Sequence, residues 1–136
     1  MISARLSLAM SAALIGWLCF GPPANASDIT GLWSTDPAAC NKIFQKKGGR
    51  TVIADDADLY GSGFIIEQNQ IRGKIATCNI KARKVDGAIT HFIASCSTDI
   101  ALQNVQFSLK TDGENKITRI YPGVPELSTN FFRCAL

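Results

Sequence analysis

The sequence predicts an all-β fold: a small antiparallel barrel or sandwich of about seven to nine strands, with one short N-terminal helix and disulfide staples. Two observations lead to this prediction. Short runs rich in β-branched and aromatic residues alternate with Gly, Asn and Asp turns along most of the chain. Four cysteines are spread almost evenly over residues 27–136, namely Cys40, Cys78, Cys96 and Cys134.

The first 26 residues have the pattern of an export signal. Arg5 supplies the positive charge, residues 6–20 form an apolar run, and Ala24-Asn25-Ala26 is a small-x-small cleavage site, so we expect cleavage after Ala26. The run is shorter than the roughly 20 residues that a membrane-spanning helix needs, so we expect no stable membrane anchor. Cys19 follows Trp17-Leu18 instead of a small residue, and we expect it to leave with the signal.

Residues 27–136 are then one domain, because a chain of this length has no room for a second core. The whole sequence has 14 basic and 11 acidic residues, and losing Arg5 leaves a mild positive charge. Its basic clusters lack interleaved aromatic residues, so we expect no nucleic-acid partner. A bacterial periplasmic or secreted location and a monomeric state are the expectations that follow.

The N-terminal part of the domain alternates between strand and helix. Residues 29–33 read as a first strand. Asp36-Pro37 then opens a short helix, with Asp as the N-cap and Pro at the first helical position. This helix carries Cys40 and is expected to end by residues 47–49, where Gly48-Gly49 lets the chain turn. Residues 50–54 resume as a strand.

The remainder reads as antiparallel strands joined by turns. The turn signals are Gln68-Asn69-Gln70, Asp86-Gly87 and residues 112–115, of which Asp86-Gly87 is the strongest. Residues 105–110 alternate between apolar and polar, as in a strand with one wet face. The expected strands are residues 64–67, 71–77, 78–85, 88–96, 105–110, 117–121 and 129–134.

Four cysteines allow three pairings, and the sequence alone does not choose among them. If the Asp86-Gly87 turn carries one extra residue, Cys78 lies opposite Cys96 in neighbouring strands, which leaves Cys40 with Cys134. Zinc sites use cysteines in close pairs, which this chain lacks, and export favours disulfides. We therefore expect no metal and no cofactor.

Several short motifs occur together in this chain. Gly31-Leu32-Trp33 is followed by Asp36-Pro37-Ala38-Ala39-Cys40, and Arg133-Cys134 stands near the end. This set resembles a group of small secreted bacterial four-cysteine proteins, and the resemblance implies a β-barrel but no activity. The G-x-W motif also resembles lipocalins, in which the tryptophan plugs one end of a barrel. Alternatively, Trp33 is a large core side chain with a buried partner for its N–H group.

The acidic segment before residue 64 is the first candidate site. Asp56, Asp58 and Gly61, with Glu67 downstream, approach the calcium-loop pattern. However, Tyr60 occupies a ligand position and a strand follows where a helix is required, so an acidic solvated loop is the better interpretation. Asp56, Asp58, Tyr60 and Ser62 form a possible binding loop.

His91 is the only histidine, so acid–base catalysis near neutral pH would need it. Ser95, Ser97 and Asp99 follow it, but nothing in the sequence brings them together as a triad. In the register that pairs the cysteines, His91 faces Arg83, which would disfavour its cationic form.

Three functions remain open. The first is a noncatalytic binding or interaction module for a periplasmic protein or a small ligand. The second is an inhibitor of a secreted hydrolase such as lysozyme, because Tyr60-Gly61-Ser62-Gly63 resembles the Ser/Gly loop of bacterial lysozyme inhibitors. The third, a small enzyme using His91, ranks last, and we do not expect an enzyme. A large apolar cavity would favour ligand binding, and a protruding loop at residues 55–63 would favour inhibition.

Overall fold

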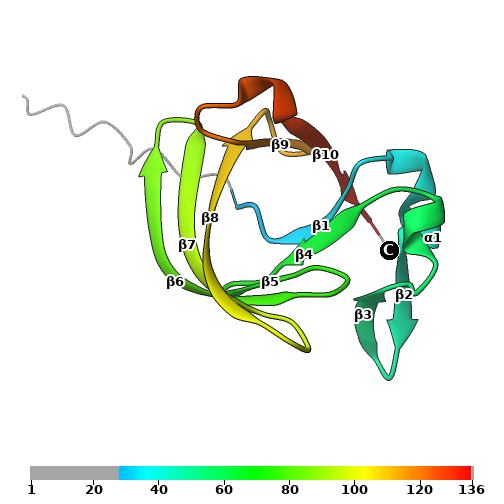
Figure 1. The fold of residues 1–136 in the computed structure, drawn as a ribbon. Helices are drawn as coiled ribbons and strands as arrows, with labels where there is room; N and C mark the ends of the chain where they lie inside the picture. Colours follow the sequence, from blue (N-terminus) through cyan, green and yellow to red (C-terminus); the bar gives the residue numbers. More distant parts are fainter. Residues whose placement is uncertain (1–27, 136) are drawn as a thin grey trace, which may run out of the picture.

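A computed structural model describes residues 28–135 of the chain. The predicted export signal, its cleavage site after Ala26 and Cys19 lie outside these residues. The described chain folds into a closed antiparallel barrel in which the strands are hydrogen-bonded in the order β1-β10-β9-β8-β7-β6-β5-β4, and β4 returns to β1 (Figure 1). This arrangement confirms the predicted all-β class and selects the barrel over the sandwich.

The barrel strands are of unequal length. Strands β6, β7 and β8 are the longest. Strands β1 and β4, which pair with each other to close the barrel, and the neighbouring β5 are short. The barrel strands are β1 (Gly31–Ser34), β4 (Gly63–Ile66), β5 (Gln70–Arg72), β6 (Thr77–Asp86), β7 (Ile89–Ser97), β8 (Leu102–Thr111), β9 (Lys116–Ile120) and β10 (Thr129–Cys134). No helix among the described residues is long and apolar enough to cross a membrane.

The segment between β1 and β4, residues 35–62, lies against the outside of the barrel, and we call it the excursion (Figure 1). It contains the 3-10 turn η1 (Pro37–Ala39), helix α1 (Cys40–Ile43), the hairpin of β2 (Phe44–Lys47) and β3 (Arg50–Ile53), and the 3-10 turn η2 (Ala57–Leu59). A further 3-10 turn, η3 (Pro125–Leu127), lies between β9 and β10.

The expected N-terminal helix is shorter than predicted. Asp36 caps it as expected, because its Oδ1 accepts a hydrogen bond from the backbone N–H of Ala38 at 2.9 Å. The helix nevertheless stops at Ile43, and residues 44–47 form a strand. The reason is Gly48-Gly49, where both glycines have positive φ (60° and 75°). Two such residues in succession make a tight hairpin turn, so this pair reverses a strand instead of ending a helix.

The β6–β7 hairpin places Cys78 opposite Cys96, but not in the way expected. The turn contains only Gly87 and Ala88, and the extra residue lies inside β6, where the register shifts between Ile80 and Ala82. This bulge moves every later residue by one position. His91 therefore faces Lys84 and not Arg83, which corrects the sequence-based pairing.

Strand β5 also ends earlier than predicted, because Gly73 to Ala76 form a loop closed by a hydrogen bond from the Gly73 N–H to the Ala76 carbonyl at 2.8 Å.

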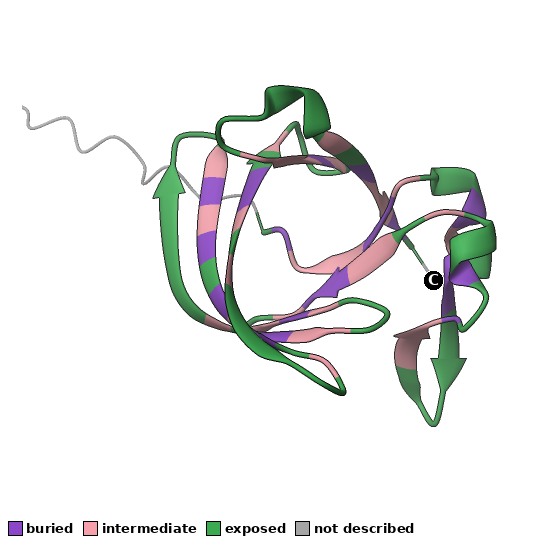
Figure 2. Cartoon of the chain, viewed as in Figure 1, coloured by how far each residue is buried: buried purple, intermediate pink, exposed green. Residues whose placement is uncertain are grey.

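Within β7, side chains alternate between buried and more exposed positions (Figure 2). The inward side chains belong to the inner core, whose buried members include Trp33, Phe92, Leu109, Ile117 and Phe131.

A second, outer cluster joins the excursion to the barrel wall. This cluster lies on the outer face of β4 and β10, where Ile65 and Cys134 pack against side chains of the excursion. These side chains are Ile43, Phe44, Ala54 and Ala57. Strands β1, β4 and β10 thus have packed side chains on both faces, whereas the long strands β6 and β8 carry many exposed side chains (Figure 2).

Candidate functional site

The antiparallel order gives the barrel two distinct ends. We call the end that carries the turns β4–β5, β6–β7 and β8–β9 the closed end. The opposite end carries residues 54–62, 73–76, 98–101 and 121–128, and we call it the open end.

Trp33 is the centre of the closed end. Its side chain is 1% exposed, and its Nε1–H donates to the Ile29 carbonyl at 2.8 Å. The guanidinium carbon of Arg133 lies 4.4 Å from the centre of the Trp33 ring. Arg133 also donates to the backbone carbonyls of Asp28, Thr30 and Glu114, so the chain entering β1 is tied to the chain leaving β8.

This contact explains the glycine of the G-x-W motif. Gly31 has φ +137°, and a Cβ at this position would lie 2.7 Å from Nη1 of Arg133. Nearby, Asp28 Oδ1 accepts hydrogen bonds from the backbone N–H and the hydroxyl of Thr30, and these bonds lower the pKa of the Asp28 carboxyl. The end of the barrel is therefore closed by backbone and side-chain hydrogen bonds, and not by Trp33 alone.

A cavity of about 380 Å³ occupies the other part of the barrel and reaches the open end. Its walls are mainly apolar, and the inward side of β8 supplies Val105, Phe107 and Leu109. Phe64 and Phe131 face the cavity as an edge-to-face pair with ring centres 4.7 Å apart. The cavity is thus an apolar chamber with an aromatic lining.

Arg119 of β9 is a charged residue on the cavity wall, where Asp58 and Lys74 at the rim are charged as well. Its side chain is half-buried, and its guanidinium carbon lies 4.8 Å from the ring centres of both Phe107 and Tyr121. Within residues 28–135 no carboxylate lies within ion-pairing distance of Arg119, and no hydrogen bond of its guanidinium is found. The rings hold this cation in place without neutralising it.

The predicted binding loop lies at the rim of the cavity. Asp58 and Ser62 line the cavity, whereas Asp56 and Tyr60 do not. Asp58 pairs with Lys74, and the Ser62 N–H donates to Thr35 Oγ1 at 3.0 Å. Leu59 is 78% exposed and Tyr60 is 41% exposed. The structure thus gathers the four residues in one loop but points them to different surroundings.

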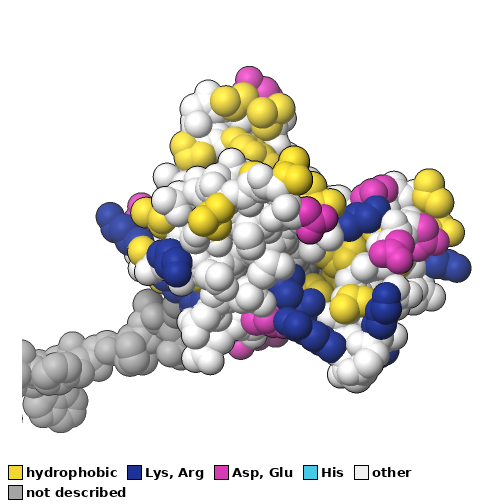
Figure 3. Space-filling model, turned by 60° about the horizontal axis from the view of Figure 1, so that its bottom comes forward, with side chains coloured by type: hydrophobic (Ala, Val, Ile, Leu, Met, Phe, Trp, Pro, Cys, Tyr) yellow, Lys and Arg dark blue, Asp and Glu magenta, His cyan; other side chains and the backbone are white. Residues whose placement is uncertain are grey.

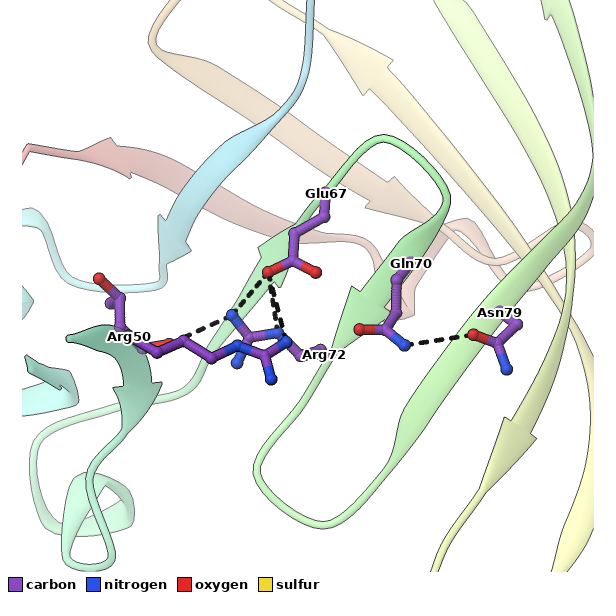
Figure 4. Close-up of polar contacts among 6 residues, drawn as sticks. Arg50, Glu67, Gln70, Arg72 and Asn79 are labelled. Carbon is purple, nitrogen blue, oxygen red and sulfur yellow. Dashed lines mark hydrogen bonds and ion pairs between the residues drawn. The ribbon is translucent and has the colours of Figure 1, made fainter. Parts of the chain in front are cut away.

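The calcium-like pattern does not converge on one point. Glu67 accepts hydrogen bonds from Nε and Nη2 of Arg72 at 3.1 and 2.8 Å, and Arg50 lies 3.7 Å away (Figure 4). Arg72 also donates to the Thr51 carbonyl, so these contacts dock the β2–β3 hairpin on the barrel. Within residues 28–135, no group of three or more His, Cys, Asp or Glu side chains is arranged to hold a metal ion.

His91 lies on the outer wall, where its Nδ1 is 2.8 Å from the hydroxyl of Ser108. The serine that it meets is on β8 and is not one of the neighbours considered from the sequence. Ser108 is 2% exposed, which leaves little room for a substrate to reach its hydroxyl. Among the described contacts no carboxylate joins this pair, so the arrangement lacks the third member of a hydrolytic triad.

The two disulfides have the pairing that strand geometry favoured. The Cys40–Cys134 bridge lies in the outer cluster and joins α1 to the last strand. The Cys78–Cys96 bridge lies in the cavity wall close to the open end. Sequence reasoning missed this second role, and it missed Arg119 and the three cavity phenylalanines. Only the alternation of Ile117 and Arg119 on β9 with Tyr121 just after it indicated that Arg119 faces inward.

Comparison of the chain with protein-family models, with curated proteins and with solved structures finds no match.

Proposed function

We propose that this protein is an exported, noncatalytic binding module that holds a small, largely apolar ligand inside its barrel. The cavity of about 380 Å³ is the observation that carries the proposal. Ligand pockets are commonly about 300–1,000 Å³, mostly apolar, and supplied with few polar groups. Arg119, Asp58 and Lys74 are the charged side chains along this lining.

The architecture supports entry from one direction. Arg133 and Trp33 close one end, whereas the loops of the opposite end carry exposed aliphatic side chains. Leu59, Ile75 and Ile100 are 78%, 79% and 95% exposed. An apolar ligand would meet these side chains before it reaches the cavity. The rim and the interior therefore both favour the binding of apolar groups.

An oxidising location is consistent with the fold, since both disulfides persist in such compartments. With the predicted export signal, this supports a periplasmic or secreted site of action. Basic and acidic side chains lie interspersed on the face in Figure 3, which favours a small ligand or a protein over a nucleic acid.

The test is to fill the cavity. Val105 and Asn104 are neighbours on β8, and alternation sends Val105 to the cavity and Asn104 to the outer wall. We expect Val105→Trp to abolish the saturable fluorescence enhancement of the neutral dye phenylnaphthylamine, and Asn104→Trp to preserve it. Circular dichroism would establish that both variants fold. Equal dye binding by both variants, or none by the parent protein, would contradict interior binding.

Inhibition of a secreted hydrolase is a second candidate, favoured by the loop at residues 55–63. This loop has a buried anchor, Ala57, and presents Leu59 and Tyr60 to solvent. A fixed loop with exposed apolar side chains is suited to insertion into an enzyme cleft. We expect Leu59→Asp to weaken inhibition of lysozyme if this candidate is right. Absence of inhibition by the parent protein would remove lysozyme as the target.

A further inference from the structure

The arginines of the described chain differ in how their charge is satisfied. Arg50 and Arg72 meet Glu67, Arg83 donates to the Gln68 carbonyl, and Arg133 donates to three carbonyls. Arg119 has neither kind of partner within residues 28–135, and it is the arginine that lines the cavity. Its stacking on Phe107 and Tyr121 fixes the guanidinium but leaves the N–H donors unused.

We propose that Arg119 binds the carboxylate of an amphipathic ligand whose apolar part fills the cavity. This inference rests on the proposed function and names the class of ligand. A guanidinium presents a planar fork of N–H donors that fits a carboxylate with two parallel hydrogen bonds. In a half-buried, apolar chamber such a charge-assisted pair is stronger than the same pair in water.

The charged side chains that line the cavity favour a ligand with one negative charge. Lys74 and Asp58 pair with each other at the rim, so they cancel. Arg119 then leaves the lining with one uncompensated positive charge. A monoanionic carboxylate balances this charge, whereas a phosphate monoester would bring nearly two negative charges to one cation. An ammonium group would be repelled at the same position.

The ligand's apolar part has a defined place. Phe64, Phe107 and Phe131 line the same chamber as Arg119, and Leu109 pairs directly with Arg119 across β8 and β9. A ligand whose carboxylate reaches the guanidinium therefore places its first carbons against aromatic and aliphatic walls. A medium-length alkyl carboxylate fits this description.

The experiment compares three ligands with the same tail: dodecanoate, dodecanol and dodecylammonium. Dodecanoate and dodecylammonium are titrated below their micelle concentrations, and dodecanol below its solubility limit, against the purified, oxidised protein by displacement of phenylnaphthylamine. We expect dodecanoate to bind about tenfold to a hundredfold more tightly than dodecanol, the range of one charged hydrogen-bonding contact. Dodecylammonium should bind more weakly than dodecanol.

Variants then assign the preference to one residue. Arg119→Gln should lower dodecanoate affinity to the level of dodecanol and leave dodecanol affinity unchanged, and Arg119→Lys should retain part of the preference. Lys110→Gln is the matched control, because it removes a positive charge from an exposed position on β8. Its ligand preferences should equal those of the parent protein.

The outcomes separate this inference from the proposed function. Equal binding of all three ligands, unaffected by Arg119→Gln, would overturn the carboxylate site and leave interior binding intact. Loss of preference in Lys110→Gln as well would show a general charge effect and would also overturn it. Binding of none of the three ligands, together with no dye binding, would overturn the proposed function itself.

Discussion

The two ends of the barrel each hold an arginine stacked on aromatic side chains, and the difference between them shows what each end does. Arg133 lies over Trp33 and donates to three backbone carbonyls in two chain segments. Arg119 lies between Phe107 and Tyr121 and faces a cavity. Arg133 thus closes one end by donating hydrogen bonds to backbone carbonyls, whereas Arg119 leaves a positive charge at the other end that is unpaired within the described chain.

The two disulfides also lie in different parts of the molecule, and their removal should have the largest effect on stability. Cys40–Cys134 spans 94 residues and Cys78–Cys96 spans 18. Chain entropy assigns about 4.7 kcal/mol to the first bridge and about 3 kcal/mol to the second. We expect Cys40→Ala with Cys134→Ala to lower the urea midpoint more than Cys78→Ala with Cys96→Ala.

Ligand binding should follow a different order, because only Cys78–Cys96 lies in the cavity wall. The variant without this bridge should remain folded and bind dye with altered affinity. Equal stability losses in the two double variants would contradict the entropic ranking.

Exchanging the arginines for glutamine should separate structure from binding. Arg133→Gln loses three acceptors and the Trp33 stacking, so we expect a loss of about 2 kcal/mol in the free energy of unfolding. Arg119→Gln loses only its stacking, and about 0.5–1 kcal/mol is expected. Chemical denaturation measures both, and a larger loss for Arg119→Gln would contradict the division of roles.

The fold was more predictable than the site. Asp36-Pro37, the Asp86-Gly87 signal and the alternation at residues 105–110 are local patterns, and each marked an element that the structure contains. Gly48-Gly49 was misread, because two glycines serve a helix end and a hairpin turn equally well until the partner strand is known.

The cavity could not be predicted in the same way. Its existence depends on how far the side chains of eight strands fill a closed barrel, which no local pattern reports. Whether Arg119 has an acidic partner likewise depends on which acidic side chains the fold places near its guanidinium. Asp58 does reach the lining, but Lys74 pairs with it. The bulge at Lys81 was missed as well, since it is visible only in the pairing of two strands.

The smallest effect should come from Asp28 at the closed end. Its folded pKa is lowered by the Thr30 hydrogen bonds, so its contribution to stability is present above the unfolded pKa and is lost as the pH falls through the folded value. The parent protein should therefore lose part of its stability below about pH 4, and Asp28→Asn should lose less over the same range. Urea midpoints from pH 7 to pH 2.5 measure this; identical acid profiles would contradict it.

One end of the barrel is sealed, and we propose that the interior, which is reached from the other end, binds a ligand. Methyl NMR of the oxidised protein during a dodecanol titration tests it most directly. We expect saturable shifts of the cavity methyls of Ile71, Val105 and Leu109, with those of Ile93 on the outer wall unchanged. Shifts confined to Ile93, or no saturable shift at the cavity methyls, would contradict it.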